Sequence, residues 1–100
     1  MTQRESEILN KIIEVLKKHL LPTQIILFGS RAKQSHPRNS DFDLAVDKDR
    51  VNIRFERKIK EDIEKVAGLY KVDIVFLDSI DQHFKDIILK TGKIVYERSS

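Results

Sequence analysis

The sequence contains no cysteine, which excludes disulfide scaffolds and thiolate-based metal or catalytic sites. It also has no apolar run near the roughly 20 residues that span a bilayer, and its first ten residues carry acids in place of the apolar core of a signal peptide. Glycine and proline are scarce, and no low-complexity linker or internal repeat divides the chain. We therefore expect a cytoplasmic protein without membrane contact that folds by packing alone.

The chain has 100 residues, of which 40% are hydrophobic and 35% are charged, as in a single globular domain spanning residues 1–100. Nineteen lysines and arginines against sixteen aspartates and glutamates leave a formal net charge of +3. This mild basic excess suits an anionic ligand such as a nucleotide, although an ordinary solvated surface would show the same balance. Direct binding of nucleic acid usually shows a stronger basic excess, so we do not expect it.

Hydrophobic periodicity predicts three helices and four strands. The helices are expected at residues 2–20, at about 51–67 and between Ser79 and Gly92, and the strands at 24–28, 41–46, 71–78 and 93–97. The order α-β-β-α-β-α-β predicts an α/β (α+β) domain in which helices pack on a small mixed sheet. The pattern leaves open whether the third strand runs parallel or antiparallel to its neighbours.

The start of the first helix has the capping-box spacing in Thr2 and Glu5, and the third helix has it in Ser79 and Gln82. Four residues of the third helix are expected to point inward: Ile80, Phe84, Ile87 and Ile88. Residues 31–40 are polar and include a proline, so we expect a loop there.

Asp41 and Asp43 are separated by one residue in the second predicted strand. Alternate strand residues point to one face about 6.6 Å apart, so both carboxylates face the same way. Two like charges at this spacing cost stability unless a cation lies between them. A pair of divalent cations, most naturally Mg²⁺, would remove the repulsion and form a site for phosphoryl or nucleotidyl transfer. Solvated acids at a strand end are the simpler alternative.

Gly29 and Ser30 end the first predicted strand, ten residues before Asp41. A glycine lets the backbone turn tightly and approach a ligand closely. Ser30 offers a hydroxyl and a backbone N–H to phosphate oxygens, and Arg31 adds a planar fork of donors suited to a triphosphate. An ordinary strand-ending turn would carry the same residues.

Asp73 interrupts the apolar third strand, where an unpaired carboxylate would be costly to bury. It either faces water at a sheet edge or meets Asp41 and Asp43 across the sheet. In the second case it could share a metal and accept the proton of an attacking hydroxyl.

Together, Phe28-Gly29-Ser30, the ten-residue spacer and Asp41-Phe42-Asp43-Leu44 resemble the signature of the nucleotidyltransferase superfamily that includes DNA polymerase beta. In size and layout the whole chain looks most like the minimal nucleotidyltransferases (MNT proteins), which consist of the catalytic core alone.

The resemblance implies that the protein binds two Mg²⁺ ions and transfers AMP from ATP with release of pyrophosphate. It implies that Gly29, Ser30 and Arg31 bind the triphosphate. Asp41, Asp43 and Asp73 would hold the metal and form the catalytic set, with Asp73 activating the acceptor hydroxyl. It further implies a hetero-oligomer with a helical HEPN-domain toxin, of which a tyrosine is adenylylated.

Two other functions stay open at this point. One is a non-catalytic antitoxin that masks its partner, and the other is a small-molecule nucleotidyltransferase subunit. His36, in the predicted loop beside two basic residues, is a further candidate for contact with phosphates or the acceptor. His19 and His83 are expected to be structural or surface residues.

Overall fold

The computed structural model of the protein describes residues 1–33 and 41–99, so His36 lies outside the described residues. The described elements are α1 (Gln3–Leu20), β1 (Gln24–Phe28), the 3₁₀ turn η1 (Gly29–Ala32), β2 (Phe42–Val46), α2 (Ile53–Ala67), β3 (Val72–Phe76), the 3₁₀ turn η2 (Leu77–Ser79), α3 (Gln82–Thr91) and β4 (Lys93–Glu97). The predicted α/β class and the order of helices and strands are confirmed.

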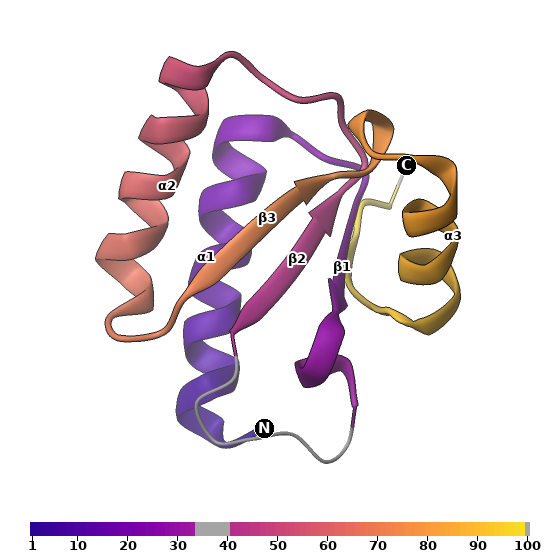
Figure 1. Ribbon diagram of the computed structural model, residues 1–100. Coiled ribbons are helices and arrows are strands. Elements are labelled where there is room, and N and C mark those ends of the chain that lie inside the picture. The colour runs from indigo at the N-terminus through magenta and orange to yellow at the C-terminus, as the bar shows by residue number, and fades with distance from the viewer. Residues whose placement is uncertain (34–40, 100) are drawn as a thin grey trace.

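The sheet has the strand order β3-β2-β1-β4, and β3 and β4 are its edges (Figure 1). β1 pairs antiparallel with both β2 and β4. β2 and β3 run parallel because α2 crosses from one to the other. The sheet is therefore mixed, and the direction of the third strand, which the sequence left open, is parallel to β2.

Helices α1 and α2 cover one face of the sheet and α3 covers the other (Figure 1). The larger core packs the apolar stripes of α1 and α2 against strand residues that include Ile25, Phe42, Leu44 and Phe76. A smaller core joins Ile88 of α3 to residues on the opposite face of the sheet, Ile26 and Ala45 among them. Within residues 1–33 and 41–99, no helix is both long and apolar enough to cross a membrane.

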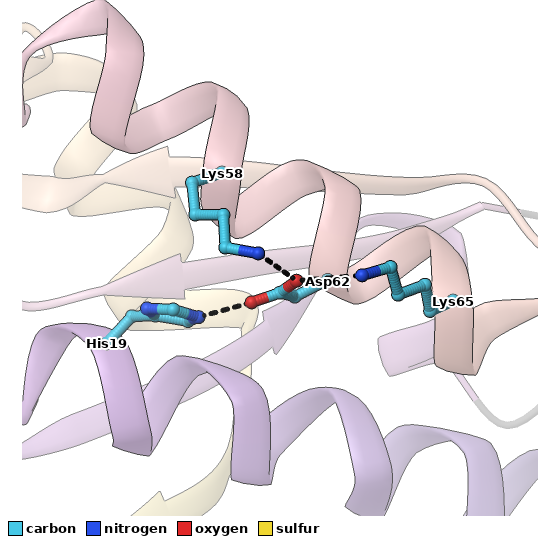
Figure 2. A network of polar contacts seen from close by, with 4 residues as sticks. All are labelled: His19, Lys58, Asp62 and Lys65. Carbon is cyan, nitrogen blue, oxygen red and sulfur yellow. Dashed lines mark hydrogen bonds and ion pairs between the residues drawn. The ribbon is translucent and has the colours of Figure 1, made fainter.

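Polar contacts join α1 to α2 at the carboxyl end of α1. The ring nitrogen Nε2 of His19 lies 2.7 Å from a carboxylate oxygen of Asp62, whose other oxygen accepts from Lys58 at 3.1 Å (Figure 2). The hydrogen bond to His19, followed by that from Lys58, lowers the pKa of Asp62 from 3.8 to about 2. His19 is thus a structural contact residue, as expected.

Two details of the predicted third helix were wrong. α3 is capped by Asp81, whose carboxylate accepts from the Phe84 N–H at 3.0 Å, whereas the hydroxyl of Ser79 accepts from the Arg50 N–H at 2.7 Å. Ser79 is therefore used by another segment. Ile87, predicted to point inward, is 45% exposed, because α3 is covered by the sheet along a narrow stripe around Ile88.

The start of the predicted loop also differs, because Arg31 and Ala32 belong to the 3₁₀ turn η1. The backbone N–H of Lys33 donates to the carbonyl of Ser30 at 3.1 Å and closes this turn.

Candidate active site

Asp43 and Asp73 are direct neighbours across two parallel strands. The register pairs Asp43 of β2 with Asp73 of β3. Phe42 packs in the larger core and Ala45 in the smaller one, so alternation turns the side chain of Asp43 toward the face that carries α3. Val75 places Asp73 on that face in the same way. The two carboxylates predicted from separate strands therefore share one surface.

Gly29 lies against the side chain of Asp43. The antiparallel register pairs Phe28 with Asp43, and Gly29 then turns the chain with a φ of +72°. A methyl group built on Gly29 would overlap the Oδ2 atom of Asp43 and lie 3.3 Å from its Cγ. The left-handed φ favours glycine, and any larger residue would displace the carboxylate of Asp43. The Gly-Ser turn and this carboxylate are therefore in close contact.

Asp41 precedes β2 and is partly buried. Its charge raises the pKa of Asp43, which shows that the two carboxylates are near enough to interact. Asp41 also lines a cavity of about 710 Å³ between α1 and the turn at residues 67–71, in company with Arg4, Lys11 and Lys71. The structure thus brings Asp41 to the rim of the site rather than to its centre.

The carboxyl group of Asp43 lies in an environment that disfavours its ionised form. Burial raises the pKa of its carboxyl above the ordinary value of 3.8, and the charges of Asp73 and Asp41 raise it further. A hydrogen bond with Asp73 adds to this effect, since it requires a proton on one of the two acids. A bound cation would reverse the preference and hold both carboxylates ionised.

The donor set fits Mg²⁺ in the way this ion usually binds. The described residues offer no group of three or more His, Cys, Asp or Glu side chains that could hold a metal without other ligands. Mg²⁺ is usually bound by one or two carboxylates together with waters and substrate phosphates. The two neighbouring carboxylates of Asp43 and Asp73 would supply the protein ligands of such a site.

Ser30 and Arg31 follow Gly29 but differ in exposure. Ser30 is partly exposed. The side chain of Arg31 is buried, forms an ion pair with Glu5 and lies over the rings of Phe42 and Tyr70. The predicted contact between Arg31 and a triphosphate stays a prediction, and the buried position of the side chain does not favour it.

Glu5 is a residue of this region whose second role the sequence did not reveal. Its capping-box spacing with Thr2 was recognised and is confirmed, with the Thr2 hydroxyl accepting from the Glu5 N–H at 3.2 Å. The additional bond to Arg31 joins residues 26 positions apart. The burial of a carboxylate at a helix start is the signal that could have indicated it, and burial is visible only in the structure.

A second cavity, of about 640 Å³, runs along α2 and the edge strand β3, and Asp73 lines it together with Val72 and Ile74. The side chain of Asp73 is exposed to solvent at this edge. The described lining of the two cavities does not include Gly29, Ser30 or Asp43. Each cavity is therefore bordered by one of the three acids, Asp41 in the first and Asp73 in the second.

Residues 10–100 match the model of the family Polymerase beta, Nucleotidyltransferase. The chain therefore belongs to the polymerase beta nucleotidyltransferase family. No curated protein matches the chain.

Among solved structures, the chain is similar to one from a toxin–antitoxin complex with AMP-PNP, at 27% identity and a TM-score of 0.75 over 89% of this chain and 73% of that chain. It is similar to a chain of the tri-AMPylated Shewanella oneidensis HEPN toxin in complex with MNT antitoxin, at 22% identity and a TM-score of 0.71, covering 96% and 74%. A minimal nucleotidyltransferase structure shares 20% identity and a TM-score of 0.67, covering 92% and 95%. The last two show a common fold.

Proposed function

We propose that this protein is a Mg²⁺-dependent nucleotidyltransferase that transfers AMP from ATP to a tyrosine hydroxyl of a HEPN-type partner. The observation that carries the proposal is the pairing of Asp43 with Asp73 beside the Gly29 turn. Membership of the nucleotidyltransferase family supports the reaction class. The 27% identical neighbour, a toxin–antitoxin complex with AMP-PNP, supports the nucleotide and the type of partner.

The turn binds the triphosphate in this proposal. Gly29 has no side chain of its own, and the carboxylate of Asp43 lies directly against it, so a ligand held by the turn would also lie near this carboxylate. The hydroxyl and N–H of Ser30 donate to phosphate oxygens, because an anion next to two carboxylates needs donors on its other side. Asp43 and Asp41 would hold Mg²⁺ together with the phosphates, and the ion would neutralise charge on the reacting phosphoryl group.

Asp73 receives the proton of the acceptor. It is exposed and lines the cavity beside β3, so an acceptor hydroxyl can approach it from the edge of the sheet. The hydroxyl oxygen attacks the α-phosphorus and loses its proton to Asp73. The bond from the α-phosphorus to the bridging oxygen breaks, and pyrophosphate leaves with that electron pair. Asp73 then passes the proton to water.

The acceptor is proposed to be a partner protein because the 27% identical neighbour is a toxin–antitoxin complex with AMP-PNP. The tri-AMPylated HEPN toxin in complex with an MNT antitoxin supports a HEPN toxin as the acceptor of AMP, and the tyrosine is what the family resemblance implies. An antitoxin role would then follow from modification of the toxin.

The test is transfer of label from ATP labelled at the α-phosphate. The protein is incubated with Mg²⁺ and with the HEPN-type protein encoded beside it, and labelled partner is measured on a gel. Asp43→Asn should lower the initial rate roughly 100-fold or more. The variant would lose a carboxylate ligand of the Mg²⁺ that neutralises charge on the reacting phosphoryl group. Asp49→Asn is the matched control, because Asp49 is an exposed aspartate beyond the other end of β2.

Two results would contradict the proposal. Absence of label with the wild-type chain would exclude transfer to this partner, and equal rates for Asp43→Asn and wild type would exclude this site. If Asp43→Asn still binds and neutralises the toxin fully, the chain acts by masking. Transfer by the isolated chain to small alcohols would instead indicate a small-molecule enzyme.

A further inference from the structure

The guanidinium of Arg31 points into the protein. Its side chain is 0% exposed, and its Nη1 donates to Oε2 of Glu5, whose side chain is 9% exposed. The other oxygen of Glu5 accepts from the Thr2 N–H at 3.1 Å and completes the capping box of α1. One buried ion pair therefore joins the Gly-Ser turn to the first turn of α1.

Two aromatic rings hold the same guanidinium. Its central carbon lies 4.1 Å from the ring centroid of Phe42 and 5.2 Å from that of Tyr70. Both distances are within the range of a cation–π interaction. The two rings also meet edge to face, with centroids 5.5 Å apart. The cation, both rings and the carboxylate of Glu5 thus form one buried cluster.

The aromatic members of this cluster belong to the segments that carry the acids. Phe42 lies between Asp41 and Asp43, and Tyr70 lies three residues before Asp73. Arg31 itself follows Ser30 directly. A shift of the guanidinium would therefore move the turn relative to the acids, because all of these side chains are attached to the same packed group.

We infer that Arg31 is a positioning residue that fixes the Gly29–Ser30 turn against β2 by its contacts with Glu5 and Phe42. It does not touch the nucleotide. The inference rests on the proposed nucleotidyl transfer, since the turn matters only if it binds the triphosphate. It assigns a function to the N-terminal turn of α1, which lies outside the site itself.

The alternative is a direct contact between Arg31 and the triphosphate. To make this contact, Arg31 would have to leave Glu5. The carboxylate of Glu5 would then stay buried without its cation, which is strongly unfavourable. The hydrogen bond from Arg31, followed by that from the Thr2 backbone, lowers the pKa of Glu5 from 4.5 to about 2. The carboxyl group of Glu5 is therefore ionised at neutral pH.

The positioning role and the direct phosphate contact of Arg31 predict opposite effects of Glu5→Gln on ATP affinity. If Arg31 positions the turn, Glu5→Gln and Arg31→Gln should each raise the Kd for ATP with Mg²⁺ roughly 10- to 100-fold, the range that a small misplacement produces. The double variant should be no worse than either single variant, because the two residues act as a unit. If Arg31 binds phosphate, Glu5→Gln removes a competing negative charge and should leave the affinity unchanged or tighter, which would overturn the inference.

ATP affinity could fall because the fold is less stable or because the turn is displaced, and the experiment must distinguish these two causes. Binding is therefore measured at a temperature where each variant is folded, and Arg31→Lys is included in case Arg31→Gln does not fold. Ile63→Val is the reference, because Ile63 is a buried core residue of α2 that is absent from this cluster. If Ile63→Val weakens ATP binding as much as Glu5→Gln, the positioning role is wrong.

A readout without nucleotide distinguishes this inference from the proposed function. In ¹H–¹⁵N spectra of the ligand-free protein, Glu5→Gln should shift the amide signals of Ser30 and Asp43, whereas Glu14→Gln, on the exposed face of the same helix, should not. Unchanged Ser30 and Asp43 signals would overturn the inference. If the signals shift but wild-type protein binds no ATP, the proposed function fails and the contact network stands.

Discussion

Asp43 and Asp73 lie opposite each other on the parallel strands β2 and β3, although the whole of α2 separates them in the chain. Because strands of one sheet move little relative to one another, this pairing gives two carboxylates a fixed separation. Burial and mutual repulsion raise the pKa of Asp43, so the folded protein holds a charge pair that is unfavourable in the absence of a cation.

The first prediction concerns the stability cost of that pair. Asp43→Asn removes one charge and keeps the side-chain shape, so it should raise the midpoint of thermal unfolding in EDTA at pH 7 while it removes transfer activity. Circular dichroism during heating measures the midpoint. The exposed control Asp49→Asn should leave the free energy of unfolding within about 0.5 kcal/mol of wild type. A lower midpoint for Asp43→Asn would mean that the carboxylate is stabilised by contacts other than those described.

The second prediction concerns the ligand. Mg²⁺ with a non-hydrolysable ATP analogue should raise the unfolding midpoint, and at 100 times Kd the stabilisation is about 2.7 kcal/mol. EDTA should abolish the effect if Mg²⁺ links the carboxylates to the phosphates. Ser30→Ala should reduce the shift without changing the midpoint of the free protein, since Ser30 is partly exposed. An equal shift in EDTA would contradict metal dependence.

The third prediction concerns Gly29. Gly29→Ala introduces a methyl group that overlaps Oδ2 of Asp43 at a residue with a φ of +72°, so we expect a loss of about 1–3 kcal/mol and much weaker ATP binding. Gly68→Ala is the matched control, because Gly68 also has a positive φ but nothing within 4 Å of the added atom. Gly68→Ala should cost stability and leave the Kd for ATP unchanged. Equal affinities in both variants would show that Asp43 can move aside freely.

The fourth prediction concerns acid. The pKa of Glu5 is lowered from 4.5 to about 2, so its ionised form stabilises the folded state. This contribution is fully present above pH 4.5, and it is lost as the pH falls toward 2. Glu5→Gln should therefore be less stable than wild type at pH 7 and show a flatter decline between pH 4.5 and 2. Denaturant unfolding at several pH values measures this difference.

Asp62 is a second acid with a lowered pKa, and a variant of it serves for comparison with Glu5→Gln. Asp62, whose pKa is also lowered to about 2, should give the same change of slope in Asp62→Asn through its bonds to His19 and Lys58. Its ordinary value is 3.8, so its window begins at a lower pH than that of Glu5. A decline in Glu5→Gln as steep as in wild type would contradict the ion pair with Arg31.

Patterns within one segment predicted much of this structure. The four-residue repeat of Ile8, Ile12 and Leu16 predicted α1 almost to its ends, because a single helix face is buried against the sheet. The alternation around Asp41 and Asp43 predicted a common face for their carboxylates, but Asp41 precedes β2 and lines a cavity beside α1, so strand geometry fixes only the direction of Asp43. The nucleotidyltransferase fold was implied by the resemblance of the Gly-Ser turn and the spaced acids to the family signature, and it is confirmed.

Features that depend on distant segments were not predictable in the same way. The parallel direction of β3, which pairs Asp73 with Asp43, results from the crossing of α2 over the sheet. The hydroxyl of Ser79 was predicted to cap α3 but accepts from Arg50, 29 residues away. The burial of Arg31 requires Glu5 and two aromatic rings from other elements, whereas a charged residue in a polar segment is typical of the surface.

The contact between Glu5 and Arg31 also decides where this domain can be trimmed. The part of the chain that matches the family begins at residue 10, so a fragment cut there would keep every acid of the site and lose Glu5. It would also lose the capping box of α1. Such a fragment would contain the whole sequence motif and yet lack the carboxylate that faces Arg31 in the core. We therefore expect that a stable domain needs residues that precede the part matching the family.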